Sequence, residues 1–175
     1  MEKKIYFIIT GGTIDSFYDP KTESGAPLEK SILPGYIHDS IRPYTSFTFK
    51  TLFMKDSGDI TPADRRKILR TVKKTKTKNI ILSHGTVTME KTAEFLKKNL
   101  PKKQKKIVII TGAMTPLMQF GMSDAGFNLG FAVSAALTQR PGVYIAMHGE
   151  IFPAGAVTKN KKKARFEPKK TSKKK

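Results

Sequence analysis

A short apolar run that ends abruptly at two glycines constrains this chain more than any other feature. Residues 5–9 are all β-branched or aromatic, and Thr10-Gly11-Gly12-Thr13-Ile14 follows directly. A run of this length without polar alternation is typical of a strand buried on both faces in a parallel sheet. The glycines allow a sharp turn at the carboxyl end of the strand, where open α/β sheets bind their ligands. Thr13 is therefore a candidate nucleophile, although an ordinary strand-to-loop turn explains the motif equally well.

Strand and helix patterns alternate along the rest of the chain. Residues 15–31 are polar and turn-rich and predict a loop long enough to act as a lid. The predicted strands that follow are 46–54, near an edge of the sheet, 79–83, 107–111 and 143–147, with helices at 34–40, 62–74, 89–100 and 123–139 and a small hairpin or arm at 150–158. This alternation predicts an α/β fold of three layers: a mostly parallel, five-stranded sheet in a flavodoxin-like strand order, with helices on both faces.

Length and composition exclude several classes of protein. The 175 residues suffice for one domain, and the absence of cysteine excludes disulfides, thiolate catalysis and a Cys-ligated metal. No apolar stretch approaches the roughly 20 residues that span a bilayer. The apolar run near the amino terminus is also short for the core of a signal peptide. The sequence thus predicts a soluble, cytoplasmic protein without membrane contact, metal or cofactor.

The formal net charge of +19 is unevenly distributed. Residues 159–175 are so rich in lysine that Phe166 is almost the only apolar side chain among them, which predicts a domain of residues 1–166 and a disordered, lysine-rich tail of residues 167–175. The tail would act as an arm for nucleic acid or another polyanion, or only as a solvated segment. The lack of interleaved aromatic residues favours the second interpretation. A second basic group, residues 65–78, is interpreted as the solvated face of a helix.

Hydroxyl side chains follow four of the predicted strands. They are Thr13, Ser57, Thr86 and Thr115. Because parallel strands end at the same edge of a sheet, these groups should converge into a site suited to attack on a carbonyl. A hydroxyl needs a base to take its proton, and Tyr18 and Lys106 are the candidates. His84 is interpreted as a hydrogen-bonded core residue rather than as a catalytic group.

Taken together, these motifs resemble the amino-terminal domain of the bacterial-type L-asparaginases. The resemblance rests on Thr10-Gly11-Gly12-Thr13-Ile14, Asp56-Ser57-Gly58-Asp59, His84-Gly85-Thr86-Val87-Thr88-Met89, and the stretch from Lys106 through Thr111-Gly112-Ala113-Met114, in this order. It extends from Lys4 to about Phe166. Most members carry a second, carboxy-terminal domain, so the short single-domain asparaginases are expected to be the better match.

The resemblance implies hydrolysis of a side-chain amide. Thr13 would attack with help from Tyr18, a β-aspartyl enzyme would form as ammonia leaves, and water would release aspartate. Ser57 and Asp59 would hold the α-carboxylate and α-amino groups of the substrate, and Thr86 and Lys106 would belong to a second set of threonine, aspartate and lysine. The same motifs imply substrate contacts for Gly12, Asp56, Gly58, Gly85, Val87 and Ala113.

Residue 87 departs from the family pattern, which has aspartate where this chain has Val87. In the family that carboxylate pairs with the lysine matched here to Lys106 and contacts the substrate's ammonium group. Loss of one partner of a buried charge pair costs about 3 kcal/mol, so a rate loss of about a hundredfold or more is expected.

Two hypotheses therefore stand. The chain is an amidohydrolase that is weakened or shifted to substrates without a free α-amine, or a non-catalytic relative that binds a small acidic metabolite or, through its tail, a polyanion. In either case the apolar helix at 123–139 predicts a homodimer or larger assembly, because a monomer would leave much of it exposed.

Overall fold

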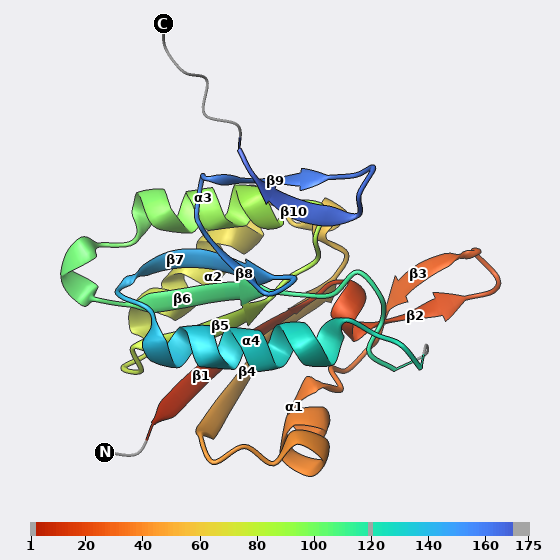
Figure 1. The fold of residues 1–175 in the computed structure, drawn as a ribbon, viewed down its shortest axis with the longest axis horizontal. Helices are drawn as coiled ribbons and strands as arrows, with labels where there is room; N and C mark the ends of the chain where they lie inside the picture. The colour runs from red at the N-terminus through yellow and green to blue at the C-terminus, as the bar shows by residue number, and fades with distance from the viewer. Residues whose placement is uncertain (1–2, 119–120, 170–175) are drawn as a thin grey trace, which may run out of the picture.

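A six-stranded sheet with strand order β4-β1-β5-β6-β7-β8 forms the centre of the molecule (Figure 1). The computed structural model describes residues 3–118 and 121–169. The strands are β1 (Lys4–Gly11), β2 (Ser16–Asp19), β3 (Ser24–Pro27), β4 (Ser46–Lys55), β5 (Asn79–Ser83), β6 (Ile107–Thr111), β7 (Gly142–Met147), β8 (Glu150–Pro153), β9 (Val157–Asn160) and β10 (Arg165–Pro168). The helical segments are η1 (Thr13–Asp15), α1 (Leu33–Gly35), η2 (Tyr36–Ile41), η3 (Ser57–Asp59), α2 (Pro62–Lys74), α3 (Met89–Asn99), η4 (Lys102–Gln104) and α4 (Ala125–Thr138).

The predicted α/β fold and its flavodoxin-like strand order are confirmed. β4, β1, β5, β6 and β7 run parallel, with β4 at one edge as expected. The prediction of five strands is wrong by one, because β8 adds to β7 in antiparallel orientation. His148 and Gly149 connect the two strands with φ values of 56° and 78°, the left-handed conformation that a tight hairpin turn requires.

Helices cover both faces of the sheet, and each face has its own apolar core (Figure 1). α2 and α3 pack on one face through residues such as Ile68 and Leu96, and the β9–β10 hairpin adds Phe166 to the same core. α4 packs on the other face together with Leu33 of α1. Both faces are covered, which explains why the central strands are apolar on both sides.

Three segments differ from what the sequence predicted. The segment 150–158, predicted as a small hairpin or arm, is divided between two sheets, because β8 pairs with β7 and β9 pairs with β10. Residues 15–31 contain a β-hairpin, β2 paired with β3, rather than a loop without strands. The predicted start of the tail at residue 167 lies inside β10, and the backbone N–H of Lys169 donates to the carbonyl of Ala156. Residues 167–169 are thus part of the fold, and the rest of the predicted tail, 170–175, lies outside the described residues.

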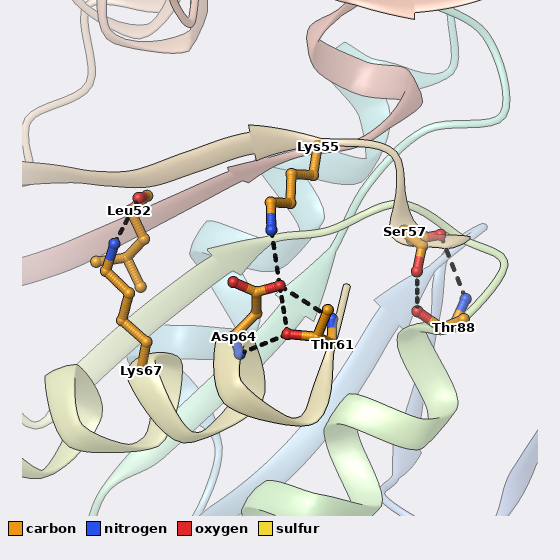
Figure 2. A network of polar contacts seen from close by, with 7 residues as sticks. All are labelled: Leu52, Lys55, Ser57, Thr61, Asp64, Lys67 and Thr88. Atoms are coloured by element: carbon orange, nitrogen blue, oxygen red, sulfur yellow. Dashed lines mark hydrogen bonds and ion pairs between the residues drawn. The ribbon is translucent and has the colours of Figure 1, made fainter. Parts of the chain in front are cut away.

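A capping network fixes the start of α2 below the edge strand β4 (Figure 2). The Thr61 side chain accepts a hydrogen bond from the backbone of Asp64, whose carboxylate in turn accepts one from the backbone N–H of Thr61. Lys55 of β4 donates to the same carboxylate at 2.9 Å. Burial raises the pKa of Asp64, but the hydrogen bonds from Lys55 and Thr61 outweigh it and lower the pKa to about 2.

We predict that Asp64→Asn lowers the free energy of unfolding by about 1 kcal/mol at neutral pH, since the pair is partly exposed and solvent screens it. The folded-state pKa of about 2 lies below the ordinary 3.8. The contribution of Asp64 is therefore complete above pH 3.8 and lost as the pH falls toward 2. Urea unfolding of the two proteins from pH 7 to pH 2 should show their difference shrinking, and a constant difference would contradict the assignment.

Candidate active site

The turns that follow β1 and β5 touch one another at the carboxyl edge of the sheet. A Cβ atom placed on Gly12 would lie 2.3 Å from the backbone nitrogen of Gly85, and Gly12 has a φ of 88°. Only glycine fits such a contact in this conformation. A Cβ on Gly85 would in turn meet the side chain of Ser57, which follows β4. Direct contacts therefore bring the three motifs together: the first two meet through their backbones, and the Ser57 side chain packs against the second.

A cavity of about 340 Å³ opens at this edge. Thr13, Tyr18 and Asp56 line it, as their assignment to one site requires. Tyr18 comes from the β2–β3 hairpin and is 43% exposed. The remaining lining residues are Gly12, Ser16, Gly25, Pro27 and Pro116.

Thr86 forms a pair with a lysine that the sequence suggested only as one of many cations in residues 159–175. Lys159 in β9 donates a hydrogen bond from its Nζ to Thr86 Oγ1 at 2.6 Å, and Thr86 is only 4% exposed. Burial lowers the pKa of Lys159, and the nearby charge of Lys161 lowers it further. The carboxylates of Asp56 and Glu90 partly offset this by raising the pKa. A lysine ammonium with a lowered pKa beside a threonine hydroxyl is suited to exchange protons with it.

Lys106 lies at the other end of the sheet, so the expectation that it faces residue 87 is wrong. It precedes β6, and its Nζ donates to the carbonyls of Thr75 and Thr77 ahead of β5. β6 runs its full length between Lys106 and the carboxyl edge. Burial lowers the pKa of Lys106, but nothing in this position brings its ammonium group to Thr13 or Thr86.

Ser57 supports the loop that carries Thr86 (Figure 2). Its Oγ accepts hydrogen bonds from the backbone N–H groups of Val87 and Thr88, and its carbonyl accepts one from Thr88 Oγ1 at 2.6 Å. Ser57 is fully buried, whereas Asp59 is exposed. The Asp56 carboxylate accepts a hydrogen bond from the backbone N–H of Gly58 at 2.7 Å, which closes the short turn between them.

A buried hydrogen-bond chain holds His84 behind the site. Its Nδ1 lies 2.8 Å from the Gly85 carbonyl and its Nε2 lies 2.8 Å from Thr92 Oγ1. Because a carbonyl only accepts, Nδ1 carries the proton, and Nε2 accepts from Thr92, to which Arg65 donates in turn. Burial lowers the pKa of His84 to about 4, although the Gly85 carbonyl opposes this. This placement agrees with the interpretation of His84 as a core residue.

Two carboxylates hold backbone segments that adjoin the residues lining the cavity. Asp15 is buried and accepts hydrogen bonds from Ser31 Oγ and the backbone of Ile32, which anchors the segment that follows β3. Burial raises the pKa of Asp15 despite these bonds. Asp124 accepts from the backbone N–H groups of Met114 and Thr115 and so shapes the turn after β6.

Val87 and Ala113 differ sharply in exposure. Val87 is 63% exposed beside Thr86, whereas Ala113 is buried under the turn that follows β6. Within the described part of the chain, no three His, Cys, Asp or Glu side chains gather closely enough to hold a metal ion. Among residues 3–118 and 121–169, no helix has the length and apolarity needed to cross a bilayer.

The family model described as "Asparaginase, N-terminal" matches residues 4–168. The chain belongs to the asparaginase family. The glutaminase-asparaginase of Acinetobacter glutaminasificans is 36% identical over 97 residues, which are 54% of this chain and 28% of that protein. One subunit of the glutamyl-tRNA(Gln) amidotransferase of Aeropyrum pernix is 34% identical over 155 residues, or 85% of this chain and 36% of that protein.

A solved asparaginase has the same fold. The thermostable L-asparaginase from Thermococcus kodakarensis superposes with a TM-score of 0.77 at 27% identity, over 94% of this chain and 51% of that one. This chain spans about half or less of the length of these asparaginase-family relatives.

Sequence reasoning missed three residues at or beside this candidate site: Lys159, Asp15 and Asp124. Lys159 was counted only with the lysine-rich residues 159–175, although it lies in a short segment, Val157–Asn160, whose first residue is buried. That buried valine, ahead of the polybasic run, is the signal that would have separated Lys159 from the lysines after it.

We predict that the protein loses stability as the pH falls from 6.5 to about 4, because His84 has a folded pKa of about 4 against an ordinary 6.5. In that pH range the unfolded chain binds a proton at His84 and the folded chain does not. This difference lowers the free energy of unfolding by about 3 kcal/mol. His84→Gln keeps a donor for Gly85 and an acceptor for Thr92 but does not titrate. Urea unfolding between these pH values should show a smaller loss of stability in His84→Gln than in the parent protein. The control His38→Gln, which changes an exposed histidine, should lose as much stability as the parent. Equal losses in all three proteins would contradict the role assigned to His84.

Proposed function

We propose that this chain is an amidohydrolase of the L-asparaginase type with Thr13 as its nucleophile. The observation that carries the proposal is the hydrogen bond between Lys159 and Thr86 at the same sheet edge as the cavity lined by Thr13. A nucleophilic hydroxyl and a separate lysine–threonine pair supply the groups that two-step hydrolysis of an amide requires.

In the first step, Thr13 Oγ1 attacks the amide carbon as the C–N bond breaks. Its proton ends on the departing nitrogen, which leaves as ammonia, and Tyr18 in the cavity wall assists the transfer. In the second step, water attacks the resulting ester, and Thr86 takes a proton from that water as it passes its own proton to Lys159 in its neutral form. The lowered pKa of Lys159 favours this role. The proton then returns to Thr13 Oγ1 as the ester C–O bond breaks. The products are the acid and free Thr13.

Val87 governs which amides the site accepts. An ammonium group on the substrate would find no carboxylate at residue 87, whereas Asp56 lines the cavity and Asp59 is exposed nearby. We infer that substrates without a free α-amine, such as N-acylated asparagine, are hydrolysed faster than asparagine. Contacts to the bound substrate are assigned to Gly12, Asp56, Gly58 and Asp59. The names of the relatives support a variable substrate, since one is a glutaminase-asparaginase and another a subunit of an amidotransferase.

We predict that the chain releases ammonia from N-acetyl-L-asparagine faster than from L-asparagine, and that Thr13→Ala lowers the rate by about a thousandfold or more. Lys159→Met should keep substrate binding but lower kcat, since it removes the proton acceptor of the second step. A coupled ammonia assay measures both. If neither amide is hydrolysed and Thr13→Ala changes nothing, the alternative replaces this proposal: a non-catalytic relative that binds a small acidic metabolite at the same cavity.

Val87→Asp tests the specificity argument separately. The new carboxylate would bind the substrate's ammonium by a charge-assisted hydrogen bond, so kcat/KM for L-asparagine should rise by at least about tenfold relative to N-acetyl-L-asparagine. Val87→Asn serves as the control, because asparagine has nearly the same shape as aspartate but carries no charge. A similar rise in both variants would mean that shape rather than charge sets the preference.

We further propose that two copies associate through α4. Phe127 is 63% exposed and stacks on Phe131 at 6.4 Å, and a Cβ on Gly130 would meet no atom within 4 Å. An apolar face of this kind, which allows close approach, fits a second copy of the same helix.

We predict a dimeric mass at micromolar concentration, and a monomeric mass for Phe127→Lys. Tyr44→Lys is the control, because Tyr44 is fully exposed on another part of the molecule. Light scattering after gel filtration gives both masses. A monomeric parent protein, or a dimer that survives Phe127→Lys, would contradict the proposed interface.

A further inference from the structure

The amino edge of the sheet, opposite the active site, carries a dense cluster of cations. Residues 70–79 contain five Lys or Arg side chains, residues 97–106 contain six, and neither stretch contains Asp or Glu. Arg140 adds a further cation ahead of β7, and Lys3 and Lys4 lie at the start of β1.

The sheet brings these segments together. Asn79 pairs with Ile107, which pairs with Gly142, so the loops that precede β5, β6 and β7 start neighbouring strands. Adjacent strands lie about 4.8 Å apart. Figure 1 shows α2 and α3 ending at this edge, while the β2–β3 hairpin lies at the opposite one. We call the loops 75–78 and 100–106 the basic edge.

Helix electrostatics explain only part of this charge. Lys73, Lys74, Lys97 and Lys98 lie in the last turns of α2 and α3, where cations complement the helix dipole. Lys76, Lys78, Lys102, Lys103 and Lys105 lie beyond these helices and are all exposed. Like charges so close together repel one another and therefore oppose folding, which suggests a role outside the fold.

Lys106 joins the two loops of the basic edge into one rigid surface. Its buried ammonium group donates to the carbonyls of Thr75 and Thr77, and the backbone N–H of Ile107 donates to the carbonyl of Lys78. Lys105 is held in a left-handed conformation with a φ of 47°. The exposed lysines are thus displayed from an ordered frame, which lowers the entropic cost of binding.

A hollow of about 320 Å³ lies between residues 97–106 and the start of β7. Lys102 and Lys105 line it together with apolar residues that include Leu100, Pro141 and Val143. Lysine side chains beside this hollow are suited to contact phosphate groups. No aromatic residue lies between the lysines of the basic edge, so stacking on unpaired bases has no platform there.

We propose that the basic edge binds nucleic-acid duplexes through their phosphate backbone, without sequence preference. Backbone contacts alone need clustered, ordered cations and no base-reading groups. The surface faces away from the cavity lined by Thr13, so duplex binding and amide hydrolysis proceed on separate edges of one domain.

The test measures the affinity of the full chain for fluorescein-labelled DNA and RNA duplexes of about 20 base pairs by anisotropy, from about 50 to 200 mM salt. The basic-edge variant replaces four exposed lysines by glutamine. These are Lys76, Lys78, Lys102 and Lys103. It should bind at least tenfold more weakly, and the slope of log K against log salt should fall by about 3 to 4, as expected for four lost phosphate contacts.

Two controls remove the same charge elsewhere. One replaces scattered, exposed lysines by glutamine: Lys30, Lys50, Lys91 and Lys162. The other ends the chain after Lys169 and so omits Lys170, Lys173, Lys174 and Lys175. The duplex affinity of both controls should stay within about threefold of that of the parent chain, and the slope of log K against log salt should change little. Melting temperatures confirm that each variant folds.

Several results would overturn the proposal. The first is no duplex binding by the parent chain at low salt. The second is an equal loss in either control, which would mean that total charge or the carboxyl-terminal lysines bind instead. The third is binding to phosphatidylserine vesicles but to neither duplex. A difference between DNA and RNA would identify which duplex the surface accepts and would support the proposal.

Discussion

The contact between Gly12 and Gly85 is the constraint on which the site depends. It lets the turns after two adjacent parallel strands share one wall, with Thr13 on one side and Thr86 on the other. Any side chain at residue 12 would collide with the backbone of Gly85, so the two turns would separate. Hydrogen bonds from the backbone of Val87 to Ser57 and from His84 to the carbonyl of Gly85 then hold the second turn in place. The hydroxyls are thus positioned by packing rather than by flexible loops.

Two lysines illustrate how position sets the role of one side chain. Lys159 and Lys106 both have a pKa lowered by burial. Lys159 donates from its ammonium group to the Thr86 hydroxyl at the carboxyl edge of the sheet, where we propose that it exchanges protons during catalysis. Lys106 donates to the carbonyls of Thr75 and Thr77 at the amino edge of the sheet, where its role is to hold the backbone of that loop. A lowered pKa marks a desolvated group, and the partner decides what that group does.

Much of the fold could be predicted because its signals are local. Apolar runs of strand length between helical patterns identified β1, β5, β6 and β7, and the helix predicted at 62–74 matches α2. The hairpins β2–β3 and β9–β10 were missed because strand pairing in polar segments is only weakly specified by the residues of each strand. Lys159 was missed for the same reason. The roles of Thr13, Tyr18 and Val87, and a cytoplasmic location, stay predictions.

The central claim is that Thr13 forms a covalent ester with its substrate. Rapid acid quenching during turnover of N-acetyl-L-asparagine, followed by peptide mass spectrometry, measures this directly, because an ester intermediate survives in acid while its hydrolysis stops. The account predicts an N-acetyl-aspartyl group on the peptide that contains Thr13, and none in the Thr13→Ala protein. An acyl group on Thr86 or elsewhere, or no covalent adduct at all, would contradict it.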